Sequence, residues 1–207
     1  MDKSKLLIFE IIYSGPIPMG LMITAEDLIQ TALNLNISHT ALLDTSDIQF
    51  HDDFRKACEK NVCGKYNATW MGPPVIGPIS ELKEKVLCFR QGLLLQTVHQ
   101  VAGSLDMKGM LAAAGEHRAV FRSFLEKIRN KFPDDNFLPL DAGCCSYCEK
   151  CAYLDDEPCR NPDWAVSSVE AYGMNVAALM KTAGMPYNHG KEAIGFVGLI
   201  LFNDPMR

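Results

Sequence analysis

Hydrophobic residues recur along the chain with two spacings, one typical of strands and one typical of helices. Short apolar runs, which indicate buried strands, lie at residues 5–12, 40–43, 92–101, 137–140 and 193–202. Helical spacing or helix-forming composition lies at residues 24–35, 51–60, 80–89, 110–131 and 167–183. Strands and helices roughly alternate, so we predict an α/β or α+β fold in which helices pack on one mixed β-sheet.

Residues at the ends of these segments sharpen the prediction. Thr24 with Asp27, and Ser167 with Glu170, have the spacing of a capping box, so a helix is expected to begin after each pair. In the strand at 137–140, Pro139 has no N–H to donate to a neighbouring strand. We therefore place that strand at an edge of the sheet.

The composition is that of a globular protein with one sizeable core. The chain has 207 residues without repeats or a Gly/Ser linker, so we expect a single domain over 1–207. Its net charge of -5 creates no basic field for nucleic acid or an anionic membrane. Apolar runs of about ten residues are too short to span a bilayer. Glu10 interrupts the first run and no small-residue cleavage site follows it, so we expect a cytoplasmic protein.

Cysteine is concentrated in the segment 142–162, which we predict to be a metal-binding loop. Five of the eight cysteines lie between residues 144 and 159. In a reducing compartment, such density indicates metal or redox chemistry before structural disulfides. Three thiolates spaced C-x2-C-x2-C, with a fourth seven residues further on, are typical of a [4Fe–4S] cluster. The predicted ligands of this metal cofactor are Cys145, Cys148, Cys151 and Cys159.

Two other interpretations of the segment remain open. Zinc also takes four cysteines, usually as two separated C-x2-C pairs, whereas here Cys148 belongs to two overlapping pairs, which favours a cluster. A thioredoxin-type dithiol normally begins a helix and would leave surplus thiols. We expect Arg160 to offset the negative charge of a cluster, and Cys144 to lie behind the ligands because its spacing to Cys148 is less suitable.

The other cysteines and the histidines give weaker signals. Four residues separate Cys58 from Cys63, and two thiols alone make a poor cluster site, so free cysteines and a ligand role both stay open. Cys88 is expected in the core, on a helix face. His99 in a strand and His117 in a helix have no visible metal-ligand partner and are expected in the core or at the surface. No nucleophile elbow, phosphate loop or Rossmann fingerprint is present.

Three stretches carry a resemblance to a known family: AGCCSYCEKC at 142–151, PCRNP at 158–162 and SVEAYG at 168–173. From about residue 55 onward the chain resembles an uncharacterised family of predicted metal-binding proteins, found largely in anaerobic bacteria and archaea. The resemblance implies that the four cysteines of the C-x2-C-x2-C-x7-C pattern are metal or cluster ligands. It carries no settled reaction.

The chain departs from the family pattern upstream. Similar proteins have a cysteine set that ends in Trp and then Cys-Pro-Pro, whereas Trp70 is followed here by Met71 and by Gly72-Pro73-Pro74. One thiolate is therefore missing. We predict that no complete second cluster forms around Cys58 and Cys63.

Together these observations predict a cytoplasmic iron–sulfur protein of an anaerobe, with electron transfer or redox support to a partner enzyme as its role. The acidic run at 155–157 could dock a basic patch on a redox partner, with an attraction that weakens as salt rises. Two alternatives stand beside it. One is an enzyme that binds a small substrate near the cluster, and the other is a zinc-stabilised binding module without a redox role.

Overall fold

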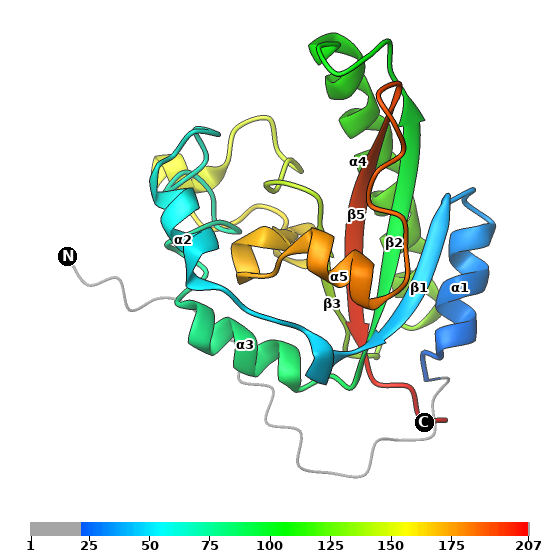
Figure 1. Ribbon diagram of the computed structural model, residues 1–207. Coiled ribbons are helices and arrows are strands. Elements are labelled where there is room, and N and C mark those ends of the chain that lie inside the picture. Colours follow the sequence, from blue (N-terminus) through cyan, green and yellow to red (C-terminus); the bar gives the residue numbers. More distant parts are fainter. Residues whose placement is uncertain (1–21, 207) are drawn as a thin grey trace.

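A mixed β-sheet forms the centre of the molecule in the computed structural model, which describes residues 22–206 (Figure 1). Within that range the five-stranded sheet has the order β1-β2-β5-β3-β4, and only β3 and β4 pair in parallel. The strands are β1 His39–Asp44, β2 Gln91–Gln100, β3 Leu138–Asp141, β4 Ser167–Ser168 and β5 Ala193–Phe202. The strand predicted at 5–12 lies outside the described residues.

Helices cover both faces of this sheet, which confirms an α+β fold with a mixed sheet (Figure 1). The helices are α1 Ala25–Leu33, α2 Asp52–Glu59, α3 Ile79–Leu87, α4 Met107–Lys131 and α5 Val176–Thr182. Short 3-10 turns are η1 Thr45–Asp47, η2 Ala152–Asp155, η3 Pro162–Trp164 and η4 Glu170–Tyr172. No helix in the described part of the chain has the length and hydropathy of a membrane span.

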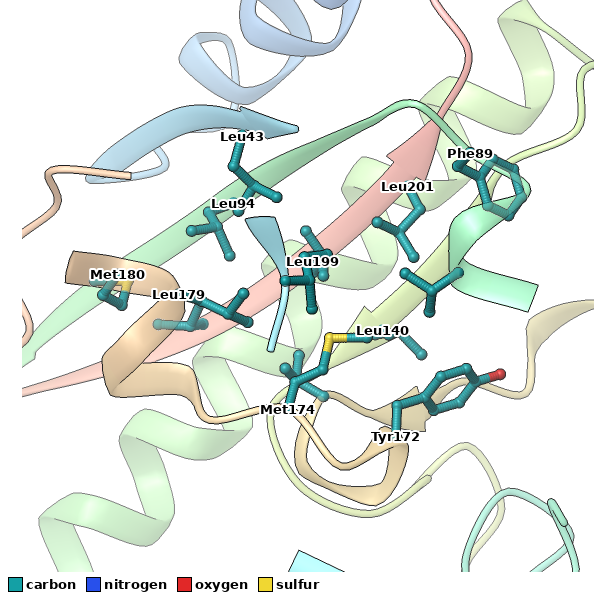
Figure 2. Packing of buried hydrophobic residues seen from close by; sticks show 14 of the residues in the cluster. Leu43, Phe89, Leu94, Leu140, Tyr172, Met174, Leu179, Met180, Leu199 and Leu201 are labelled. Atoms are coloured by element: carbon teal, nitrogen blue, oxygen red, sulfur yellow. The ribbon is translucent and has the colours of Figure 1, made fainter. Parts of the chain in front are cut away.

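The two central strands separate two hydrophobic cores. Neighbouring residues of a strand point to opposite faces, so Leu93 of β2 packs with α1 and α4 while Leu94 packs with α3 and α5. Figure 2 shows the second core, which contains Leu199 and Leu201 of β5 and Leu179 of α5. Both faces of β2 and β5 are thus buried, which explains why these strands are continuous apolar runs.

Close packing of α4 on the sheet depends on a small residue in β5. A Cβ added to Gly198 would lie 2.3 Å from Cε2 of Phe121 on α4, a distance that real side chains do not tolerate. Phe121 is itself 3% exposed. Glycine at this position therefore lets the long helix approach the strand.

The expected edge position of the strand at 137–140 is wrong. β3 lies between β5 and β4, so it has a neighbour on each side. β4, however, has only two residues and pairs with Leu140 and Asp141. Pro139 pairs with Ile200 of β5 and has no partner in β4, so its missing N–H costs no ladder hydrogen bond on the β4 side.

The capping prediction is confirmed at the first helix and wrong at the last. The Thr24 side chain accepts a hydrogen bond from the Asp27 N–H at 3.2 Å, as a capping box requires. Ser167 instead belongs to β4, and the one-turn η4 ends at Gly173, whose φ of +80° is left-handed. The last helix begins later, where the Asn175 side chain accepts a hydrogen bond from the Ala178 N–H.

Candidate metal centre

The cysteine-rich segment is the connection between two parallel strands. Antiparallel strands can be joined by a tight hairpin, but parallel neighbours need a crossover that returns the chain to the same end of the sheet. Here residues 142–166 leave the end of β3 and return to the start of β4 beside it. Apart from the turns η2 and η3, this crossover has no regular secondary structure. Its two ends are fixed by the sheet, so the loop between them is held in place.

The four cysteines predicted as ligands line one pocket, which we call the four-thiol pocket. They are Cys145, Cys148, Cys151 and Cys159. Each is a half-buried free thiol, and the hollow contains about 370 Å³ of space that atoms do not fill, part of it open to solvent. The Asn161 side-chain amide donates a hydrogen bond to Sγ of Cys148 at 3.3 Å. No carboxylate lines the pocket, so sulfur is its main donor atom.

A distant loop covers this pocket. Trp70 and Met71 belong to its wall, although they precede the cysteine segment by some seventy residues. The Trp70 indole N–H donates to the Glu157 carbonyl at 2.9 Å, and its ring meets Tyr153 edge-on at 5.1 Å between centroids. The Ser167 hydroxyl of β4 donates to the Met71 carbonyl at 2.7 Å. These contacts join the upstream and downstream motif segments into one site.

The comparison with protein families agrees with this geometry. The family described as "Predicted metal-binding protein (DUF2284)" matches residues 41–202. The chain belongs to this family. The matched range contains the sheet except for the first two residues of β1, the covering loop and all eight cysteines. No curated protein and no solved structure matches the chain.

In this family member, Cys144 interacts with the two upstream cysteines. Cys63 lies close enough to Cys144 to raise its pKa, and the charge of Cys58 interacts with both. We call Cys58, Cys63 and Cys144 the three-thiol group. Burial, reinforced by Cys63, raises the pKa of Cys144 to about 11, and burial also raises the pKa of Cys58. Cys58 and Cys144 are therefore protonated at neutral pH unless a metal binds them.

The position that departs from the family pattern, Gly72, lies against Thr69, which lines the four-thiol pocket, and against the backbone of Lys65. A Cβ added to Gly72 would lie 3.1 Å from Oγ1 of Thr69 and 3.7 Å from the carbonyl oxygen of Lys65. The charge of Lys65 acts on Cys144 and lowers its pKa, against the larger effect of burial. Gly72 thus packs against a residue that neighbours the three-thiol group.

A second hollow adjoins the four-thiol pocket, and sequence reasoning missed it. Cys145 and Tyr147 line both hollows. The second one is also lined by Arg118 of α4 and by Asp141, the last residue of β3. Oδ1 of Asp141 lies 2.8 Å from Nε2 of His117, which is 2% exposed. A histidine on an otherwise apolar helix face was the one sequence signal of this dyad.

The acidic run beside the pocket is largely paired within the crossover. Arg160 donates to Glu157 at 3.2 Å and lies 3.8 Å from Asp155, which also forms an ion pair with Lys150. The three carboxylates at 155–157 carry three negative charges, and Lys150 and Arg160 carry two positive charges, so one negative charge is left in excess. Each pair is well exposed, so it contributes little to stability and weakens as salt rises.

The prediction that Cys88 lies in the core is wrong. Cys88 is exposed, not in the core: it ends α3, and its thiol donates to the Glu84 carbonyl at 3.3 Å. Within residues 22–206, no three His, Cys, Asp or Glu side chains are arranged to hold a single metal ion. The donor chemistry of the four-thiol pocket nevertheless fits a thiolate-bound metal group, because four cysteines and a sulfur-directed amide line it.

Proposed function

We propose that the four-thiol pocket holds one [4Fe–4S] cluster and that the protein passes electrons to or from a partner protein. The observation that carries this proposal is that the four cysteines of the C-x2-C-x2-C-x7-C pattern line the same pocket. A cubane cluster has four irons, each of which takes one cysteine thiolate. Four ligands therefore occupy every iron, which favours electron transfer over binding of substrate to iron.

The residues around the pocket suit this role. The Asn161 amide that donates to the Cys148 sulfur stabilises negative charge there, and hydrogen bonds to cluster sulfurs are among the factors that set reduction potentials. Trp70, Met71 and Ala152 supply apolar walls that limit access of water. Arg160 lines the pocket with its positive side chain and offsets part of the added charge.

A partner protein would meet the exposed side of the crossover. Residues 155–157 lie there and keep one excess negative charge after pairing with Lys150 and Arg160. That charge favours a partner with a modest basic patch and predicts a weak dependence on ionic strength. All eight cysteines are free thiols, which fits a reducing compartment, and we place the protein in the cytoplasm of an anaerobe.

Electron paramagnetic resonance under anaerobic conditions tests the proposed role. Protein reduced with dithionite should give the signal of a reduced cluster and lose it on reoxidation, without any added ligand. The variant C88S, which removes an exposed thiol outside both thiol groups, is the matched control and should behave like the wild type. A change in the reduced signal when a small metabolite binds directly to iron would favour an enzyme instead.

A further inference from the structure

A chain of hydrogen bonds runs from the surface of α4 to the hollow beside the four-thiol pocket. Oε2 of Glu116 lies 3.0 Å from Nδ1 of His99, and Nε2 of His99 lies 2.8 Å from the Thr97 hydroxyl. The same hydroxyl lies 2.8 Å from Nδ1 of His117. Nε2 of His117 completes the chain at 2.8 Å from Oδ1 of Asp141. Four contacts thus connect five side chains without a gap.

The two ends of this chain reach different environments. The Glu116 side chain is 69% exposed, and exposure falls to 13% at His99 and 2% at His117. It then rises to 16% at Asp141, which lines the second hollow together with Arg118 and Cys145. The middle of the chain is buried among aromatic rings, because both histidines meet the ring of Phe196 on β5. The chain therefore links bulk solvent to a partly enclosed hollow through the protein interior.

Four hydrogen bonds along the chain require one hydrogen more than its neutral members supply. Four hydrogen bonds need four hydrogens, and an ionised carboxylate at each end donates none. Two neutral imidazoles and one hydroxyl provide only three. All four bonds are satisfied when one histidine is an imidazolium. The fourth hydrogen can therefore belong to His99 or to His117.

The two arrangements differ by the movement of two hydrogens. With the imidazolium at His99, its Nε2–H donates to the Thr97 oxygen, and the Thr97 hydroxyl donates to Nδ1 of His117. If the first hydrogen moves to the Thr97 oxygen while the hydroxyl hydrogen moves to Nδ1 of His117, the imidazolium is at His117. No bond is lost, and one positive charge has moved from the exposed histidine to the buried one beside Asp141.

We propose that these five residues form a proton relay that delivers a proton from solvent at Glu116 to the hollow lined by Asp141. A proton enters at the Glu116–His99 pair, two hydrogens shift along the Thr97 hydroxyl, and His117 transfers its Nε2 proton to Asp141. The carboxyl group then offers that proton to the hollow. The relay supplies protons to a reaction or charge change in the hollow, beyond the electron transfer proposed above, and does not depend on which metal the cysteines hold.

The charges around the inner end favour an acceptor that carries negative charge. Arg118 and Arg122 of α4 line the hollow with Asp141, and none of the described residues pairs with Arg118. A second carboxylate, that of Glu170 in η4, interacts electrostatically with Asp141. A small anion beside Arg118, or added negative charge at Cys145, would be neutralised by a proton from Asp141.

Nitrogen-15 NMR of histidine-labelled full-length protein tests the relay across pH. In the wild type, His99 and His117 should change their ring ¹⁵N shifts in one shared transition, because one proton is distributed over both. Replacement of the hydroxyl in T97V should split this into two independent transitions, and T97S should restore the shared one. Independent transitions in the wild type, or a shared one in T97V, would overturn the relay.

A surface variant makes the test independent of Thr97. In E116Q the amide can donate to Nδ1 of His99, so four hydrogens are present without an imidazolium. The shared transition should therefore disappear. E126Q, an exposed change on the same helix and outside the chain, should leave the transition in place. An unchanged transition in E116Q would contradict the hydrogen count.

Discussion

The two thiol groups of this protein differ in the number of their thiols and in how the chain holds them. The four thiols of the four-thiol pocket all belong to the crossover, whose ends are fixed by β3 and β4 and whose open side is covered by Trp70. The three-thiol group joins Cys58 at the end of α2, Cys63 in the following turn and Cys144 on the crossover. It therefore depends on a contact between separate segments, and it has one thiol fewer.

This difference shows that a high density of cysteines in the sequence does not by itself define a metal site. Cys144 adjoins Cys145 in the sequence, yet the two side chains belong to different groups. A cluster needs four thiolates around one space, which the crossover supplies by itself. In the three-thiol group, burial keeps Cys58 and Cys144 protonated, so metal binding there would first have to release protons.

The largest expected effect comes from removing one cysteine from each thiol group in turn and comparing the two variants. C151S should reduce bound iron from about four per chain to less than one and should destabilise the fold, because metal binding and folding are coupled. C63S should keep full iron content, since Cys63 belongs to the other group. Iron analysis and thermal unfolding check both variants. Equal iron loss in C63S would show that the two groups form one site.

Addition of a cysteine near the three-thiol group tests whether the number of thiols distinguishes the two groups. G72C restores a thiol at the position where the family pattern has one, next to Lys65. If ligand number is what limits the three-thiol group, iron should rise from about four towards about eight per chain. G72A, which adds the Cβ without sulfur and meets the same contact with Thr69, is the control. Unchanged iron in G72C would mean that geometry, not ligand number, distinguishes the groups.

Removal of the cover should affect only the four-thiol pocket. W70A loses the hydrogen bond to Glu157 and the edge-on contact with Tyr153, at a cost of about 2 kcal/mol for a half-buried tryptophan. Bound metal should then be lost to a chelator several times faster than in the wild type. W164A removes the other tryptophan, which does not line this pocket, and should not change that rate. Identical rates in W70A and wild type would refute the covering role.

The smallest predicted effect concerns the reactivity of the three-thiol group. Burial is the main cause of the raised pKa of Cys58, and the nearby Glu170 adds to it. Loss of that negative charge in E170Q should lower the pKa, so more thiolate is present at pH 8 and alkylation should be about twofold faster. Mass spectrometry of iodoacetamide-treated protein measures this, with exposed Cys88 as the internal reference. Slower alkylation of Cys58 would reverse the predicted sign.

The raised pKa of Cys58 also makes the stability of the folded protein depend on pH. Because the folded-state pKa of Cys58 lies above the unfolded value, the folded state favours the protonated thiol. The stabilising contribution is fully present below the unfolded pKa, near 9, and is lost as the pH rises through the folded pKa. C58A should therefore lose less stability than the wild type as the pH rises above 9. Denaturant unfolding across that range measures the difference, and equal pH dependence would contradict it.

Local sequence patterns predicted the parts of the fold that depend on local physics. The runs at 92–101 and 193–202 became β2 and β5 because burial on both faces requires an unbroken apolar strand. The two-residue β4 has serines and no hydrophobic pattern, so nothing in its sequence marks it as a strand. Its pairing with β3 is a contact over distance, and it moves β3 from the predicted edge into the sheet.

In the candidate site too, local sequence predicts some features, and contacts between distant segments determine the others. Spacing alone grouped the four cysteines, because a tight loop brings residues three apart towards one space. The association of Cys144 with Cys63 joins segments that sequence spacing cannot relate. The contact of His117 with Asp141 likewise depends on how α4 lies against β3, which only the packing of the whole sheet determines.

The most direct test of the central claim is the iron, acid-labile sulfide and zinc content of wild-type protein purified without oxygen. One cluster in the four-thiol pocket predicts about four irons and four sulfides per chain, a brown colour and no stoichiometric zinc. One zinc per chain with no sulfide would contradict the account and would make the same four cysteines a structural zinc site.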